Sequence, residues 1–159
     1  MISPGPAGSL QLVTFLIDGT RYAVALSATE RAFPMVAASA VPGAPPVVLG
    51  AVNIAGEVVP VVDLRRRLGL GPRSYGLGAH LLLLRTSRRP LAVAADEVQG
   101  VADIDGRSIA PRETVIPGLG PVAGIAALPD GLLFIYDIEA FLTQDEERQL
   151  GRALGRTET

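Results

Sequence analysis

The side chains in this sequence that could do acid–base, nucleophilic or metal chemistry are few and scattered. The 159 residues include one histidine, His80, and neither cysteine nor lysine. The absence of cysteine excludes disulfides, thiolate nucleophiles and cysteine-based metal sites. The absence of lysine excludes Schiff-base chemistry and the phosphate-binding loop that requires this residue. A lone histidine near a strand end is typical of an ordinary surface residue, so we expect no metal and no cofactor.

Two pairs of acidic residues are candidate catalytic groups, Asp96 with Glu97 and Asp103 with Asp105. General acid–base catalysis needs two carboxylates that converge from different elements into a dry pocket. Neighbouring residues on one strand point to opposite faces, so Asp96 and Glu97 diverge if their segment is extended. Residues 118–123 match a loose dinucleotide-binding pattern, but a proline interrupts it and no βαβ unit surrounds it. The sequence therefore favours a protein that is not an enzyme, with a flexible loop at 118–123.

Charge and hydropathy exclude further classes. The formal net charge is −2, which lacks the basic excess that a nucleic-acid surface normally needs. No apolar run approaches the roughly 20 residues of a membrane-spanning helix. Residues 1–10 lack the pattern of a signal peptide and are expected to form a disordered lead. We therefore expect a cytoplasmic protein that neither binds nucleic acid nor inserts into a membrane.

The elements that must position any site are mainly short strands. Apolar segments that meet at turn residues predict four strand pairs. These are Leu12–Ile17 with Arg21–Leu26, Val47–Ile54 with Glu57–Val62, His80–Arg85 with Leu91–Ala95, and Val122–Leu128 with Leu132–Tyr136. The continuous apolar character of residues 47–52 predicts burial on both sides, by an inter-barrel core or by a partner.

Helix signals are few. Capping-box patterns predict a short helix from Ser27 that Pro34 stops, and a terminal helix from Thr143 to about Leu154. Asp63 could cap a single helical turn. Residues 96–101 fit either a short turn of helix or a bent strand. The glycine-rich segment 71–79 is the best candidate for a boundary or a mobile loop.

The pattern of elements occurs twice. Gly50 lies thirteen residues before Asp63, and Gly124 lies thirteen residues before Asp137, 74 residues later. This duplication predicts two similar β subdomains. Their few short strands suffice for two small closed barrels but not for two sandwiches. Which strands close which barrel stays open, because repeats can exchange strands.

Several stretches resemble the CheW family, most specifically Gly50-Ala-Val-Asn-Ile-Ala-Gly56-Glu-Val-Val-Pro-Val-Val-Asp-Leu-Arg65. The likeness extends over about residues 12–142. It implies an all-β fold of two SH3-like five-stranded β-barrel subdomains with short helices. It divides the chain into the CheW-like domain at 11–142 and a C-terminal helix and tail at 143–159.

The resemblance also implies a non-enzymatic scaffold in chemotaxis or a related chemosensory pathway. Its expected partners are the regulatory domain of a CheA-type histidine kinase and the cytoplasmic tip of a chemoreceptor, a methyl-accepting chemotaxis protein. Carried over residue by residue, the resemblance implies a receptor-facing groove drawn from both halves of the chain. Its expected residues are Leu26, Thr29, Arg31, Gly50, Ala55, Leu81, Val98 and Val101.

Two of these positions depart from the family pattern. Ala55 stands where the family usually carries arginine, and alanine cannot replace that planar five-donor group. Arg31 stands where the family usually has an acid, although a one-residue shift would place Glu30 there. Two alternatives therefore stay open: a divergent CheW-like interaction module without kinase coupling, and an enzyme or small-molecule sensor that uses the inter-barrel cleft.

Overall fold

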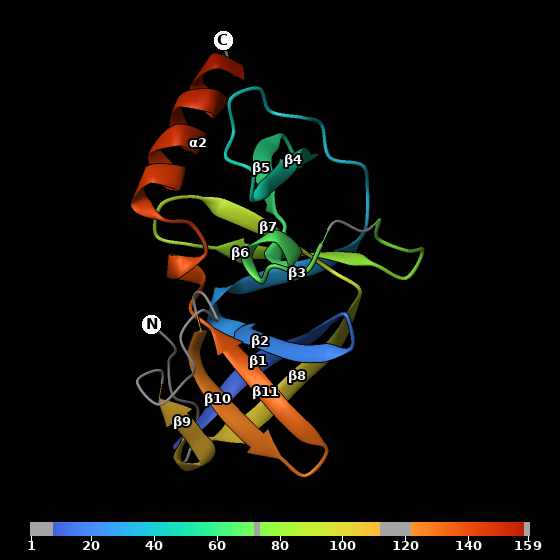
Figure 1. The fold of residues 1–159 in the computed structure, drawn as a ribbon, viewed down its shortest axis with the longest axis vertical. Coiled ribbons are helices and arrows are strands. Elements are labelled where there is room, and N and C mark those ends of the chain that lie inside the picture. Colours follow the sequence, from blue (N-terminus) through green and yellow to red (C-terminus); the bar gives the residue numbers. More distant parts are fainter. Residues whose placement is uncertain (1–7, 72–73, 112–121, 158–159) are drawn as a thin grey trace.

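The computed structural model describes residues 8–71, 74–111 and 122–157, and divides their strands between two sheets (Figure 1). The strands are β1 (Ser9–Ile17), β2 (Thr20–Ala25), β3 (Thr29–Pro34), β4 (Val48–Ile54), β5 (Glu57–Val62), β6 (His80–Arg85), β7 (Pro90–Ala95), β8 (Glu97–Asp105), β9 (Ile109–Pro111), β10 (Val122–Leu128) and β11 (Gly131–Tyr136). The helices are α1 (Leu64–Arg67), α2 (Gln144–Thr157) and the one-turn 3₁₀ helices η2 (Leu26–Ala28), η3 (Gly106–Ser108) and η5 (Ile138–Ala140).

The four expected strand pairs are confirmed as antiparallel hairpins: β1–β2, β4–β5, β6–β7 and β10–β11. Two-residue turns join β1 to β2 and β4 to β5. Both residues of each turn have positive φ, as this hairpin type requires. The Asp63 cap is confirmed, because its carboxylate accepts a hydrogen bond from the Arg65 backbone N–H. Thr143 and Glu146 also form the expected capping box at the start of α2.

The expected helix from Ser27 to Pro34 is wrong. Only Leu26–Ala28 form a single 3₁₀ turn, and Thr29–Pro34 form strand β3. The Thr29 hydroxyl donates to the carbonyl of Ala25 rather than capping a helix. β3 pairs with the leucine-rich strand β6, and this pairing overrides the weak local helix signal. Residues 97–105 likewise form a strand, which resolves the open alternative at 96–101.

Each sheet contains one edge strand that follows, along the chain, a hairpin of the other sheet. The six-stranded sheet has the order β8–β1–β2–β11–β10–β9, and the five-stranded sheet has the order β3–β6–β7–β5–β4. The chain leaves β2 to add β3 to the edge of the five-stranded sheet, and leaves β7 to add β8 to the edge of the six-stranded sheet. Residues 71–79 are not a boundary between sheets, because β5 and β6 flank them and belong to the same sheet.

The inner strands of each sheet bury side chains on both faces, which explains their continuous apolar sequences. Leu82 and Leu84 of β6 point into a large core between the two sheets, while Leu81 and Leu83 point into a smaller core enclosed by their own sheet. The six-stranded sheet encloses a third core around Leu12. Val47, Val48 and Ala51 join the large core and Val52 joins the smaller one, so the chain itself buries residues 47–52 on both sides.

The fold class is confirmed as mainly β, with two sheets and few helices. The expected count of five strands holds for one sheet, and the other has six. Within the described ranges the end strands of neither sheet pair with each other, so closed barrels are not seen. The expected disordered lead lies largely in residues 1–7, and the expected loop at 118–123 lies largely in 112–121; both stretches are outside the described residues.

Helix α2 lies along the five-stranded sheet, although it follows the last strand of the other (Figure 1). Its apolar face buries Leu150, Ala153 and Leu154 in the large core. Its first turn forms ion pairs from Glu146 to Arg67 and from Glu147 to Arg89. No helix in the described part of the chain is long and apolar enough to cross a membrane.

Candidate functional site

The candidate site is a surface groove of about 280 Å³ on the five-stranded sheet. It is mainly apolar and is bordered by the edge strand β3, by β6 and by the β4–β5 hairpin. Its lining residues are Arg31, Phe33, Pro34, Val36, Val52, Asn53, Ile54, Ala55 and Leu81. Because β3 and β4 stand at opposite ends of the strand order, the sheet must curl to bring them to one groove. The groove therefore lies where the two free edges approach each other.

Three of the eight expected residues meet at this groove. Leu81 is buried and forms its floor, since it faces the enclosed core together with Phe33. Arg31 is exposed on β3, and its guanidinium lies 4.2 Å from the centre of the Phe33 ring. This cation–π contact holds a positive charge at the rim of an apolar surface.

Ala55 occupies the tip of the β4–β5 hairpin at the opposite rim. Its φ of 53° lies in the left-handed region, followed by Gly56 at 86°. The Asn53 side chain accepts a hydrogen bond from the Gly56 N–H at 2.9 Å and supports this turn. The methyl group of Ala55 itself offers no hydrogen-bond donor to the groove.

Gly50 has a structural role in this fold. A Cβ at this position would lie 2.5 Å from the carbonyl oxygen of Ser39, whose backbone bridges to Ala51. The glycine therefore permits a second chain segment to pack against β4. It does not line the groove.

The other four expected residues lie outside the groove lining. Leu26 and Thr29 sit where the chain passes from β2 to β3, and Leu26 is half-buried against the large core. Val98 and Val101 lie on β8 in the other sheet. Val98 also packs against the large core, whereas Val101 is 60% exposed.

Sequence reasoning missed most of the lining, in particular Phe33 and Val36. Phe33 was placed in a helix that does not form, so its proximity to Leu81 could not be inferred. Val36 is 52% exposed and follows the end of β3. The detectable signal was the apolar stretch Ala32–Val36, which a strand assignment would have placed on the sheet edge.

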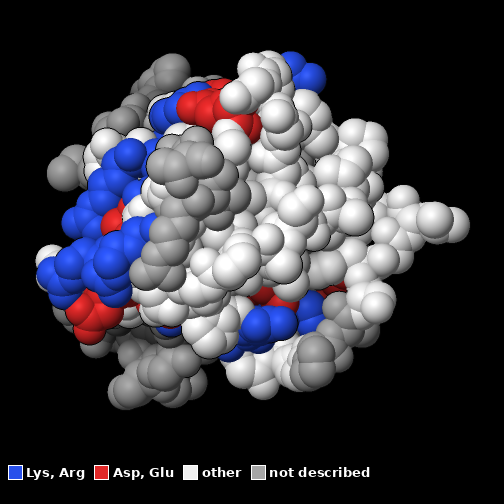
Figure 2. Space-filling view, turned by 90° about the horizontal axis from the view of Figure 1, so that it is seen from above, with Lys and Arg blue, Asp and Glu red and all other residues white. Residues whose placement is uncertain are grey.

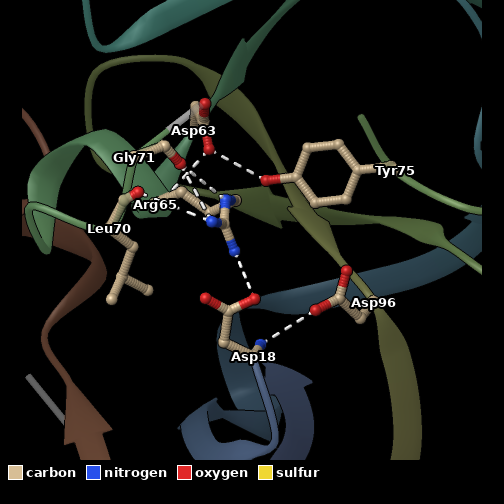
Figure 3. Close-up of polar contacts among 7 residues, drawn as sticks. All are labelled: Asp18, Asp63, Arg65, Leu70, Gly71, Tyr75 and Asp96. Atoms are coloured by element: carbon tan, nitrogen blue, oxygen red, sulfur yellow. Dashed lines mark hydrogen bonds and ion pairs between the residues drawn. The ribbon is translucent and has the colours of Figure 1, made fainter. Parts of the chain in front are cut away.

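A polar cluster joins the two sheets on another side of the molecule (Figure 3). Arg65 of α1 is only 5% exposed and forms an ion pair with Asp18 in the β1–β2 turn. Its guanidinium also donates to the carbonyl of Gly71 at 2.9 Å. Asp18 raises the pKa of Arg65, and the Asp18 N–H donates to the Asp96 carboxylate at 2.9 Å. The only buried arginine among the described residues thus fixes one hairpin against the other sheet.

Asp63 and Tyr75 complete this cluster. The Tyr75 hydroxyl donates to the Asp63 carboxylate at 2.8 Å. The pKa of Tyr75 is raised, mainly because the hydroxyl is buried and secondly because of this hydrogen bond. From the sequence, the run Arg65-Arg66-Arg67 is typical of a solvated helix face, but this is wrong for Arg65, which is buried in this network. These contacts pair the charged groups where the two sheets meet, so we assign the cluster a structural role.

The acidic pairs considered as catalytic groups are explained by turns and caps. Asp96 holds the β1–β2 turn through Asp18. Asp105 caps η3, and the neighbouring Arg107 guanidinium lowers the pKa of Asp105. His80 contacts the carbonyl of Gly78 at 2.9 Å. In the ranges that the structure describes, no three histidine or acidic side chains gather as a metal site would need.

The fold and the groove define a small two-sheet β domain with an apolar surface site. The chain belongs to the CheW-like domain family, whose profile matches residues 11–146. It is 23% identical over 141 residues to a protein named "Probable chemotaxis protein CheW" from Rhizobium etli, covering 87% of this chain and 91% of that one. It is 21% identical over 141 residues to "Chemotaxis protein CheW" from Rhizobium meliloti, with the same coverage.

A solved structure shares the fold. The crystal structure of the scaffolding protein TtCheW from Thermoanaerobacter tengcongensis superimposes with a TM-score of 0.77 at 23% identity. The match covers 86% of this chain and 94% of that chain. The two-sheet arrangement is therefore that of a known CheW structure.

Proposed function

We propose that this protein is a non-enzymatic cytoplasmic scaffold that couples chemoreceptors to a CheA-type histidine kinase. The observation that carries the proposal is the match of the CheW-like family profile to residues 11–146, nearly the whole chain. The similarity to proteins named for chemotaxis and to a named scaffolding protein supports the same role. In this role the protein joins two partners in a signalling assembly and transforms no substrate.

The groove supplies a surface suited to the receptor. An apolar groove with a charged rim fits an amphipathic helix, which lays its apolar face into the groove and its polar residues along the rim. The cytoplasmic tip of a chemoreceptor is a helical coiled coil of this kind. We propose that the receptor contacts Arg31, Ala55 and the exposed part of Val36, while Leu81 forms the floor.

The remaining expected residues have graded roles in this proposal. Val101 is exposed on β8 and is the best candidate for a receptor contact outside the groove. Leu26 and Val98 pack against the large core, so we propose that they shape the surface between the sheets. Thr29 and Gly50 act through the backbone, by fixing the start of β3 and the approach of Ser39.

We also propose that each curled sheet corresponds to one SH3-like barrel of the family, and that residues 11–142 form one CheW-like unit. The supporting observation is that each sheet encloses its own apolar core in addition to the shared one. A sheet that buries residues on its concave face must curl strongly around them.

A second candidate is an interaction module that has lost kinase coupling. Ala55 and Arg31 favour it, because they change the charge and the hydrogen-bonding capacity of both groove rims. Ala55→Arg restores the group that the family usually carries and separates the candidates. Under the scaffold proposal the wild type binds both partners and the variant changes affinity modestly. Under the second candidate the wild type fails to bind one partner and the variant regains binding.

Titration calorimetry with the kinase regulatory domain and the receptor tip of the same organism tests the proposal. Val36→Asp places a charge in the groove, and Leu132→Asp is a matched control because these side chains are 52% and 53% exposed. We expect Val36→Asp to weaken receptor binding by about tenfold or more, as loss of a central contact does. Leu132→Asp should leave receptor binding unchanged.

The outcomes are separable because both variants change exposed residues and should fold. Failure of the folded wild-type protein to bind either partner would refute the coupling role. Equal receptor binding by wild type and Val36→Asp would refute the groove assignment alone. Val101→Asp, read in the same assay, tests the proposed contact on β8.

A further inference from the structure

The outer face of α2 is a rigid platform. Its inner face is buried through Leu150 and Leu154, and its first turn is tied to the five-stranded sheet by Glu146 and Glu147. The Gln149 side chain also donates to the carbonyl of Gly43 at 3.0 Å. A helix held at this many points presents its exposed side chains in fixed positions.

Arginines gather where α2 meets the turn between β6 and β7. Arg148 and Arg152 are exposed and one helical turn apart, so they lie on the same side of α2. Arg89 of the turn reaches α2, where its Nη2 lies 3.5 Å from the position a Cβ of Gly151 would take. Figure 2, seen from the α2 end, shows blue side chains concentrated along one edge of this face. We call Arg88, Arg89, Arg148 and Arg152 the arginine patch.

The acids close to this patch are already engaged. Glu147 pairs with Arg89, Asp145 pairs with Arg148, and Glu139 accepts hydrogen bonds from the backbone N–H and the hydroxyl of Ser87. Within the part of the chain that the structure describes, the guanidinium groups of Arg88 and Arg152 have no hydrogen-bond or ion-pair partner, although the Arg88 backbone N–H donates to the Thr86 hydroxyl. Two exposed guanidinium groups therefore remain available on a rigid surface.

We propose that the arginine patch is a binding surface for an acidic segment of a partner protein. The planar fork of arginine pairs with carboxylates through two parallel hydrogen bonds, and rigid placement of the patch reduces the entropy lost on binding. The patch is positive although the whole chain carries a net charge of −2, so it also steers acidic segments to this face. The patch shares no residue with the groove lining, and the proposal does not depend on the proposed function.

The chemistry of the patch favours a protein over a membrane or a nucleic acid. The strongly exposed large apolar side chains in the described ranges are Val36, Leu77, Val101 and Leu132, and none belongs to the patch. Surface binding to a membrane normally adds burial of such side chains. Nucleic-acid binding requires the neutralisation of many phosphates, for which two available guanidinium groups are few.

Fluorescence anisotropy with a fluorescein-labelled Glu/Ser-rich peptide tests the proposal, with a Gln/Ser-rich peptide as the neutral probe. The test variant carries Arg88→Glu and Arg152→Glu together. The control is Arg107→Glu, because the Arg107 side chain lies in η3, between two strands of the other sheet, and is 92% exposed. We expect the acidic peptide to bind the wild type, with weaker binding as salt is added, and the double variant to lose about tenfold in affinity. The control should bind like the wild type.

Four results would overturn the proposal. These are no binding of the acidic peptide to the wild type, equal binding by the double variant, an equal loss in the Arg107→Glu control, or equal binding of the neutral peptide. Competition by short duplex DNA, or by phosphatidylcholine vesicles containing phosphatidylserine, should be weaker than competition by unlabelled acidic peptide. Stronger competition from either would assign the patch to that class of partner instead. Circular dichroism confirms that each variant is folded.

Discussion

The two sheets have the same order of hairpin, capping aspartate and short helix, but two different side-chain contacts hold them together, one made by an arginine and the other by a glutamate. In each sheet a hairpin ends in an aspartate that caps a short helix: Asp63 before α1 and Asp137 before η5. The second residue after each aspartate contacts the turn of a hairpin in the other sheet. On one side this residue is Arg65, which pairs with Asp18. On the other side it is Glu139, which accepts two hydrogen bonds from the Ser87 N–H and one from its hydroxyl.

Comparison of the two contacts shows which features of the repeated unit are required by the backbone and which depend on side chains alone. Capping aspartates, tight turns and the glycines at strand bulges recur because the chain geometry needs them. The contacts between sheets are made by side chains, so charge can reverse as long as the two partners change together. One of the two contacts is an ion pair between the buried Arg65 and the exposed Asp18, and the other is an exposed set of hydrogen bonds.

The largest difference is expected between the two contacts that join the sheets. Arg65→Met removes a buried guanidinium with its hydrogen bond to the Gly71 carbonyl, and it leaves the 31% exposed Asp18 carboxylate beside Asp96 without its cation. We expect a clear loss of stability. Glu139→Gln keeps an acceptor for the exposed Ser87 and should change stability little. Urea denaturation should show a much larger fall in midpoint for Arg65→Met. Adding Asp18→Asn to Arg65→Met should recover part of the loss; no recovery would show that the cost is packing and not charge.

The next difference concerns the two glycines at equivalent bulges. A Cβ on Gly50 would lie 2.5 Å from the Ser39 carbonyl oxygen, which belongs to the backbone. A Cβ on Gly124 would lie 2.7 Å from the Cγ2 of Ile109, a side chain that can move, and 3.0 Å from the Ala110 carbonyl oxygen, so the backbone crowds it less than at Gly50. We expect Gly50→Ala to cost about 2–3 kcal/mol and Gly124→Ala about 1 kcal/mol in the free energy of unfolding. Gly71→Ala, with open space around it, is the control; a reversed order of costs would contradict this account of the bulges.

Two tyrosines give a smaller contrast. Tyr75 donates to Asp63, whereas the hydroxyl of the buried Tyr136 has no hydrogen-bond partner in the described residues. Tyr75→Phe should therefore lower the free energy of unfolding by about 1 kcal/mol, the net value of one hydrogen bond. Tyr136→Phe should leave it unchanged or raise it slightly, since it removes an unsatisfied polar group. Thermal denaturation followed by circular dichroism measures both, and a comparable loss in the two variants would indicate a water-mediated partner for Tyr136.

Much of the local structure could be predicted from the sequence because its signals are local. The Asp18-Gly19 turn, the Asp63 cap and the Thr143–Glu146 capping box each depend on residues that are neighbours along the chain. The spacing from Gly50 to Asp63 and from Gly124 to Asp137 also revealed the duplication before any topology was known.

The groove and the contacts between the sheets could not be predicted because they depend on long-range pairing. Thr29–Pro34 becomes a strand only by pairing with β6, about fifty residues later, and this pairing brings Arg31 and Phe33 to Leu81. Arg65 reads locally as part of a charged run, and only the curvature of the sheets places it against Asp18. The exchange of β3 and β8 between sheets likewise leaves no signal within either segment.

The smallest effect is expected at two alanines in different hairpins, of which Ala55, at the tip of β4–β5, has a φ of 53°. An L-residue pays a steric cost in this region that glycine does not, so Ala55→Gly should stabilise the protein by up to about 1 kcal/mol. Ala127→Gly, on the β10–β11 hairpin, should instead destabilise it by about 0.5–1 kcal/mol, because Ala127 lies in a strand with ordinary φ. Urea denaturation of both variants checks the opposite signs. Destabilisation by Ala55→Gly would mean that packing of the methyl group at the groove rim contributes more to stability than its backbone strain costs.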